Sequence, residues 1–170
     1  MTSATAGGFR RGPRIGVDVG SVRVGVARCD PDGILAVPVA TLARSPQGTD
    51  LDSLVELVAE HEPLELVVGL PLGLDGREGA AAGAARDYAV ALVERLRTAG
   101  LTVPVRLVDE RLSTAAATRG LQAAGRDARS ARGVVDQAAA VIIVQHAVDA
   151  ERATGTPPGV LLEPGEDPHR

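Results

Sequence analysis

The sequence predicts an α/β fold in which helices cover both faces of a five-stranded mixed sheet. Two observations carry this prediction. The first part of the chain alternates apolar with polar or small residues at a period of two, which is typical of antiparallel strands. Further along, short apolar runs alternate with segments of helical period, and parallel strands need such crossover helices.

Three strands are expected first, over residues 15–19, 22–28 and 34–41. In the first two, isoleucine or valine occupies every second position at the start of the run. The pair Gly20-Ser21 predicts a hairpin between these two strands, and the sequence DPDG at 30–33 predicts a tight turn before the third.

Helices and strands alternate next. A helix is expected to open at Asp50 and to end at Pro63, because its leucines and valines share one face. A buried strand follows at 64–70, then a long helix over 81–96 and a strand at 103–108.

Two more helices complete the pattern. Ser113 or Thr114 is expected to cap a helix that reaches about Ala123. A polar, Arg-rich loop is expected at 125–133, followed by a last helix at 134–148. This order of elements is the layout of the ribonuclease H-like fold, in which helices cover a mixed sheet.

The folded domain is expected over residues 13–150, between two disordered tails. Residues 1–12 are small, polar and rich in glycine. Residues 151–170 contain four prolines and scattered acids. Segments of such composition bury little apolar surface.

The composition, with 45% hydrophobic and 24% charged residues, excludes a fibrous or wholly disordered chain. No apolar stretch reaches the roughly 18 residues of a membrane helix. The first residues lack the apolar segment of a secretory signal, and the single cysteine, Cys29, suits a reducing compartment. A cytoplasmic protein is therefore expected.

The basic residues restrict the chemistry and suggest a partner. All 18 are arginine, which excludes lysine Schiff bases and Walker-type phosphate loops. The formal net charge is −4, yet residues 106–132 carry six arginines against three acids. Such a basic face can bind nucleic acid despite the acidic mean. The alternative is that these arginines lie on solvated helix faces.

Asp18 stands in the middle of an apolar strand, within the motif DVGSVRVGVA at 18–27. A carboxylate in such a place is costly unless it is paired, hydrogen-bonded or bound to a cation. Gly20 and Gly25 allow a backbone or a phosphate to approach closely, and Arg23 is a natural phosphate partner. The alternative is a tight hairpin in which the aspartate is satisfied locally.

Two further motifs begin in strands. VVGLPLGLDG at 67–76 leads a strand into a loop, which is either a rigid corner or a segment facing the substrate backbone. VDERLST at 108–114 places Asp109 and Glu110 at the end of a strand. Adjacent residues of an extended chain point to opposite faces, so only one of these two carboxylates can aim at a site.

Asp136 lies near the start of the last expected helix, within RGVVDQAAAVI at 132–142. Taken alone, it fits a first-turn acid favoured by the helix dipole. Taken with Asp18 and the strand-end acids, it predicts oxygen ligands that converge at one edge of the sheet. Hard cations such as Mg²⁺ prefer ligands of this kind.

These four motifs, in this order, resemble the YqgF/RuvX family of ribonuclease H-like, RuvC-like nucleases. The resemblance runs from about Arg14 to Val148. It implies a metal-dependent nuclease that hydrolyses phosphodiester bonds of structured nucleic acid. The implied task is processing of the 5′ end of pre-16S rRNA in ribosome biogenesis, with Holliday junction resolution as a second activity. The alternative is a ribosome-assembly factor that binds rRNA without cleaving it.

By match of motif, the family's catalytic and metal-binding acids fall on Asp18, Glu110 and Asp136, which would hold Mg²⁺ or Mn²⁺. No acid ends the strand at Gly69 and Leu70, so the following strand supplies it instead. The residues expected to bind the substrate are Arg23, Arg111, Ser113, Thr114, Arg126, Arg129 and Arg132.

Cys29 follows the second expected strand and precedes the turn at 30–33, so we expect it near the surface at a sheet edge. One interpretation is a small, half-buried apolar residue. The other is a thiol that links two subunits of a homodimer under oxidation.

Overall fold

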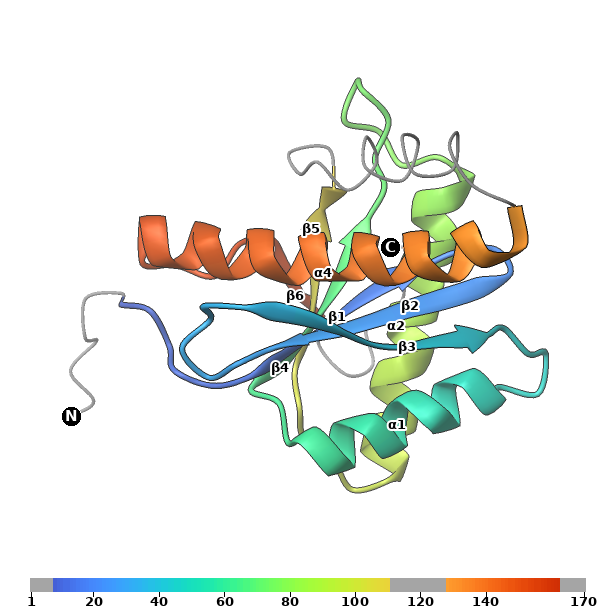
Figure 1. Cartoon of the computed structure of the whole chain (residues 1–170), viewed down its shortest axis with the longest axis horizontal. Helices are drawn as coiled ribbons and strands as arrows, with labels where there is room; N and C mark the ends of the chain where they lie inside the picture. Colours follow the sequence, from blue (N-terminus) through green and yellow to red (C-terminus); the bar gives the residue numbers. More distant parts are fainter. Residues whose placement is uncertain (1–7, 111–127, 163–170) are drawn as a thin grey trace.

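The computed structural model describes residues 8–110 and 128–162, with side chains in the second range described from residue 137 onward. These residues build one six-stranded sheet with helices on both faces (Figure 1). The strands are β1 (Arg14–Val19), β2 (Arg23–Cys29), β3 (Ala36–Ala43), β4 (Glu65–Leu70), β5 (Val105–Asp109) and β6 (Val160–Leu162). The helices are α1 (Thr49–His61), α2 (Ala80–Thr98) and α4 (Ala128–Thr154). The expected fold class is confirmed, with one strand more than predicted.

The strand order, β3-β2-β1-β4-β5-β6, places β4 between β1 and β5. β1 runs antiparallel to β2 and parallel to β4, which in turn runs parallel to β5. The carboxyl ends of three parallel neighbours, β1, β4 and β5, therefore meet at one edge of the sheet. Residues at or just beyond these ends are brought together, although they are far apart in the sequence.

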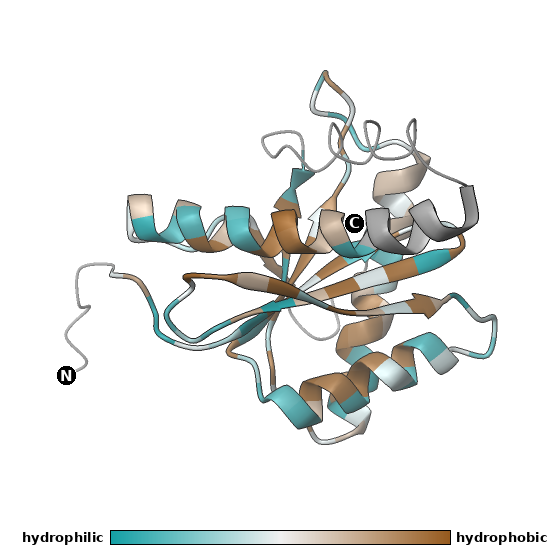
Figure 2. Ribbon diagram, viewed as in Figure 1, coloured by the Kyte–Doolittle hydropathy of each residue, from teal (hydrophilic) through white to brown (hydrophobic). Residues whose placement is uncertain are grey.

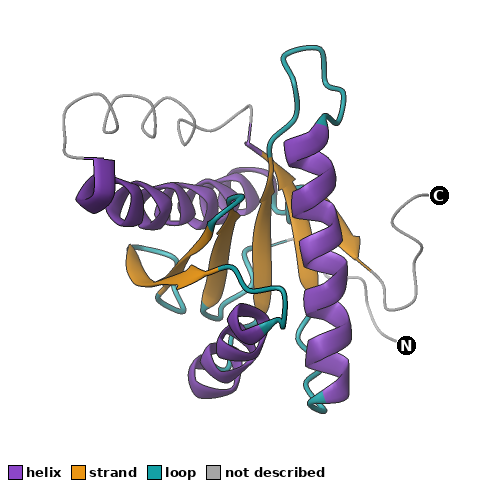
Figure 3. Ribbon diagram, turned by 90° about the vertical axis from the view of Figure 1, so that its right-hand side faces the viewer, coloured by secondary structure: helices purple, strands orange, loops and turns teal. Residues whose placement is uncertain are grey.

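Hydrophobic residues follow the strands through the centre of the molecule (Figure 2). On the face covered by α1 and α2, Val17, Val26 and Val68 pack against Leu54 and Leu92. Figure 3 shows α4 on the opposite side of the sheet. Within the described residues, no helix combines the length and apolarity needed to cross a membrane.

The face under α4 carries small residues, so that the helix lies directly on the strands. A Cβ atom at Gly16 would lie 2.7 Å from the carbonyl oxygen of Ala140 and 2.7 Å from the Cβ of Val144. Ala27 on the neighbouring strand and Ala140 are both fully buried. Glycine on β1 thus fixes how closely α4 approaches the sheet.

An ion cluster of three arginines and two buried glutamates lies on the same face, where β1 and β4 begin. Each glutamate binds two arginines: Arg10 Nε and Arg14 lie 2.7 and 2.8 Å from Glu151, while Arg10 and Arg106 lie 2.9 and 3.2 Å from Glu65. Both glutamates are at most 2% exposed. Burial alone would raise the pKa of Glu151, but hydrogen bonds and positive charge from Arg10 and Arg14 outweigh burial and lower it.

The ion cluster also fixes the segment that precedes β1. Arg10 belongs to this segment and is its link to both glutamates. The ring of Phe9 lies under the guanidinium groups of Arg14 and Arg152, with centroid distances of 4.8 and 4.5 Å. The expectation of a disordered tail over 1–12 is therefore wrong for residues 9–12, and residues 1–7 lie outside the described residues.

The expected disordered tail over 151–170 is wrong as far as residue 162. Helix α4 continues to Thr154, and β6 adds an antiparallel edge strand to β5. Prolines at 157 and 158 precede this strand, and Gly159 makes the turn with a φ of 81°. The proline-rich composition hid a strand of only three residues, which pairs with β5 and buries Leu162 in the core.

The loop expected over 125–133 is also corrected, because α4 begins at Ala128. A single glycine in a helix costs about 1 kcal/mol relative to alanine, so Gly133 does not end this long helix. Asp136 is consequently two turns inside α4 and not at its start. The helix expected from Ser113 or Thr114 to Ala123 lies outside the described residues.

Cys29 is only 1% exposed, so the expected surface position is wrong. It shares the α4-covered face with Ala27, two residues earlier on β2, and its Sγ accepts a hydrogen bond from the Arg14 amide at 3.4 Å. Burial raises the pKa of the thiol. A disulfide between two subunits through Cys29 therefore has no structural basis.

Replacing Glu151 with glutamine should strongly destabilise the fold. The change leaves the buried Arg14 guanidinium facing a neutral amide, and removing one partner of a buried pair costs about 3–5 kcal/mol. Urea unfolding at pH 7 measures this loss. The matched control is Glu60→Gln on the exposed face of α1, which should change the free energy of unfolding by less than about 0.5 kcal/mol.

The same pair of proteins gives a pH test. Because the pKa of Glu151 is lowered in the fold, its contribution is present above the ordinary glutamate value of about 4.3 and is lost as the pH falls through the folded value. The stability difference between wild type and Glu151→Gln should be constant near neutrality and shrink in acid. A difference that persists undiminished in acid would contradict the role assigned to this charge.

Candidate active site

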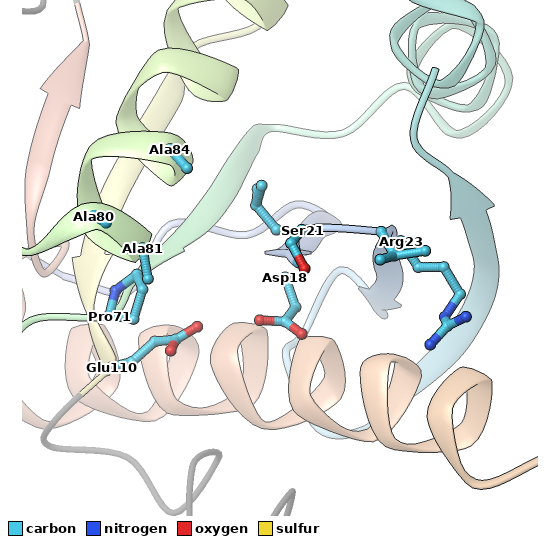
Figure 4. A pocket seen from close by; sticks show the side chains of 11 residues that line it. Asp18, Ser21, Arg23, Pro71, Ala80, Ala81, Ala84 and Glu110 are labelled. Carbon is cyan, nitrogen blue, oxygen red and sulfur yellow. The ribbon is translucent and has the colours of Figure 1, made fainter. Parts of the chain in front are cut away.

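A pocket of about 750 Å³ opens where the carboxyl ends of β1 and β5 meet the amino end of α2. The β1–β2 hairpin forms one wall, Pro71 and the first turns of α2 form another, and Glu110 closes a third side. Figure 4 shows the carboxylates of Asp18 and Glu110 directed into the same space.

Strand alternation positions Asp18. Val17 and Val19 point to the core under α1 and α2, so Asp18 shares the α4-covered face with Gly16. Its partner on β2 is Gly25, which offers no side chain on that face. The carboxylate is 3% exposed and lines the pocket.

Glu110 follows β5 directly, and its carboxylate reaches the pocket across β4. Its neighbour Asp109 pairs with Leu70 at the end of the parallel ladder. Glu110 is 6% exposed and lines the pocket, whereas Asp109 is half-buried and is not among the lining residues. Of the two adjacent carboxylates, the structure therefore directs Glu110 into the pocket.

Arg23 also lines the pocket, at the start of β2. Its carbonyl oxygen accepts a hydrogen bond from the Gly20 amide at 2.9 Å, which closes the hairpin. A Cβ at Gly20 would lie 2.7 Å from that same oxygen, so the tight hairpin requires glycine there. The sequence correctly predicted this hairpin, and Figure 4 shows the Arg23 side chain at the rim of the pocket, extending away from Asp18.

Arg44 supports this hairpin and was not found from the sequence. Its guanidinium donates a hydrogen bond to the Gly20 carbonyl at 3.3 Å, and its backbone amide donates to Val22 at 2.9 Å. The same guanidinium lies 5.2 Å from the ring centroid of Tyr88 on α2. No sequence motif links residues 44 and 88, because their contact depends on how α2 docks on the sheet.

The α2 side of the pocket presents only methyl groups. Ala80, Ala81 and Ala84 line it, and all three are exposed. Gly79 precedes the helix and has no side chain that could cap its amino end. Helical spacing alone gave no sign that these alanines line a pocket, since alanine occurs both in cores and on surfaces.

For the remaining expected site residues, the structure describes either the backbone alone or neither backbone nor side chain. Asp136 falls in α4, one turn before the buried residues Ala139 and Ala140. The backbones of Arg129 and Arg132 also belong to α4, but the side chains of all three are outside the described set. Arg111, Ser113, Thr114 and Arg126 lie outside the described residues altogether.

Where side chains are described, no three histidine, cysteine or carboxylate side chains gather into a metal-type cluster. The pocket itself supplies two carboxylates, Asp18 and Glu110.

The fold is similar to that of the RuvC protein solved as "T. thermophilus RuvC in complex with Holliday junction substrate". The TM-score is 0.55 at 19% identity, over 85% of this chain and 99% of that one. The mixed sheet with its crossing helix thus defines the ribonuclease H-like class. Residues 12–150 match the family model "RuvX: Holliday junction resolvase". The chain belongs to the RuvX family and is a nuclease, a hydrolase acting on phosphodiester bonds.

Relatives match over nearly the whole chain. A Streptomyces coelicolor protein named "Putative pre-16S rRNA nuclease" is 51% identical over 91% of this chain and 90% of its own length. A Kineococcus radiotolerans protein of the same name is 55% identical over 91% of this chain and 80% of its own.

Proposed function

We propose that this chain is a metal-dependent nuclease that processes the 5′ end of pre-16S rRNA in the cytoplasm. The observation that carries the proposal is the pair of buried carboxylates, Asp18 and Glu110, that two separate strands bring into one open pocket. Arg23, on the hairpin that forms one wall of the pocket, suits a phosphate partner.

The pocket fits a divalent cation. Two carboxylates, those of Asp18 and Glu110, line it together. Their oxygens are the ligands that Mg²⁺ and Mn²⁺ prefer, and Asp18 and Glu110 would hold such an ion. Asp136, in α4 one turn before the buried Ala139 and Ala140, is the proposed third ligand. When bound, the cation would activate water and neutralise charge that develops on the phosphate.

The other residues of the pocket would bind and orient the substrate. Arg23 would contact a phosphate next to the bond that is cleaved. The exposed methyl groups of Ala80 and Ala84 leave the amino end of α2 accessible to the sugar-phosphate backbone. Further backbone contacts are proposed for Arg111, Ser113, Thr114, Arg126, Arg129 and Arg132.

The choice of substrate is supported by relatives about 50% identical to this chain, which carry the name pre-16S rRNA nuclease. A second candidate substrate is the Holliday junction, because the family description names it. Both are structured nucleic acids with a phosphodiester to be hydrolysed.

Asp18→Asn should reduce Mn²⁺-dependent cleavage of a pre-16S rRNA 5′ leader fragment by more than about 100-fold. The expectation follows because residues that merely support a metal ligand already contribute 10–100-fold. The fold should survive, since the amide has the same shape as the carboxylate. Gel-resolved cleavage in Mn²⁺ and in EDTA measures the effect, with Asp149→Asn on the exposed face of α4 as the matched control.

Full activity of Asp18→Asn would contradict the assignment of the site. Wild-type protein that binds the fragment but does not cleave it with either Mg²⁺ or Mn²⁺ would instead favour a non-cleaving assembly factor. Running a four-way DNA junction in parallel decides between the two candidate substrates.

Arg23→Ala should weaken binding of the same RNA in EDTA across different sequences. Loss of one phosphate contact lowers the slope of log affinity against log salt by about 0.7–0.9. Fluorescence anisotropy at several salt concentrations measures this slope. Arg97→Ala, at the exposed far end of α2, should leave the slope unchanged. Equal slopes for Arg23→Ala and wild type would remove Arg23 from the substrate path.

A further inference from the structure

We propose that Gly69 is a positioning residue for Glu110: the absence of a side chain on β4 lets the carboxylate cross that strand into the pocket. The inference rests on the proposed function, because it assigns Glu110 to the cation site. Gly69 is the fifth residue of β4 and pairs with Val108 on β5. Every residue of β4 is buried.

The sheet creates a distance that Glu110 must cover. Asp18 lies on β1 and Glu110 follows β5, with β4 between the two strands. Neighbouring strands are about 4.8 Å apart, so the backbones of β1 and β5 are separated by about 10 Å. Two carboxylates can share a cation across this gap only if one side chain extends over β4.

The space over Gly69 is occupied by that side chain. A Cβ atom at residue 69 would lie 2.2 Å from Glu110 Oε1 and 2.9 Å from its Cδ, closer than real contacts allow. The same Cβ would lie 2.6 Å from Cδ1 of Ile143 on α4. Glu110 is thus held between the backbone of β4 below and α4 above. Any side chain at residue 69 must displace either the carboxylate or the helix.

Backbone conformation does not explain this glycine. Positive φ angles occur at other glycines of the described chain, such as Gly76 and Gly159, but not at Gly69. Gly16 provides a useful contrast, because the three nearest atoms that a Cβ there would meet all belong to Ala140 and Val144 of α4. Gly16 therefore serves helix packing, whereas Gly69 serves both packing and the path of Glu110.

The test separates these two roles by first relieving the helix contact. Ile143→Val removes Cδ1, and Gly69→Ala is then introduced in that background. The Glu110 carboxylate should leave the pocket in the crystal structure of Gly69→Ala/Ile143→Val. Mn²⁺ affinity, measured by electron paramagnetic resonance with the metal alone, should fall about 10- to 100-fold relative to Ile143→Val.

Gly83→Ala is the control for a glycine substitution as such. Gly83 lies on α2, and a Cβ there would meet nothing within 4 Å. This variant should keep the Mn²⁺ affinity of wild type.

A stability cycle covers the case in which the variant folds poorly. In the Ile143→Val background, Gly69→Ala should lower the melting temperature when Glu110 is present and much less when Glu110 is replaced by alanine. An equal loss in both cases would overturn the proposal, as would a carboxylate that stays in the pocket with unchanged Mn²⁺ affinity.

These experiments separate a failure of the Gly69 proposal from a failure of the proposed function. If wild-type protein bound no Mn²⁺ at all, the metal-dependent activity would be wrong. The crystal structure and the stability cycle would still decide whether Gly69 positions Glu110.

Discussion

Helix α4 can rest on the centre of the sheet only because β1 carries a glycine beneath it. With any side chain at Gly16, the carbonyl of Ala140 and the side chain of Val144 would have to move away. The close approach lets one helix contact β1, β2, β3 and β4 and exclude water from the centre of that face. It also sets the narrow space in which Glu110 lies over Gly69, so the shape of the pocket depends on the same constraint.

The α4-covered face carries one charged region at the start of β1 and a second near the end of β1. At the start of β1, Arg14 meets Glu151, and arginines from three segments of the chain compensate the two glutamates. Asp18 lies four residues further along β1, and its side chain and that of Glu110, which follows β5, line an open pocket. The first region fixes the carboxyl-terminal half of α4 and the segment before β1. The second region brings two carboxylates from separate strands into one pocket.

The sequence predicted those features that arise from local pattern. Alternating valines defined β1 and β2, and the buried Asp18 was identified from its apolar neighbours. Features that depend on tertiary contacts were missed. β6 depends on its pairing with β5 and on the burial of Leu162 in the core, and the burial of Cys29 depends on α4 crossing over β2. Strand alternation left the choice between Asp109 and Glu110 open, and the actual end of β5 shows that Glu110 is the one that lines the pocket.

The central claim is that Asp18 and Glu110 form one cation site. Anomalous diffraction at the manganese edge, from crystals of the full chain soaked in millimolar Mn²⁺, tests it directly. The account predicts a peak in the pocket within coordination distance of both carboxylates, with Asp136 as a further ligand. An empty pocket in a well-ordered crystal, or manganese bound only elsewhere on the molecule, would contradict it.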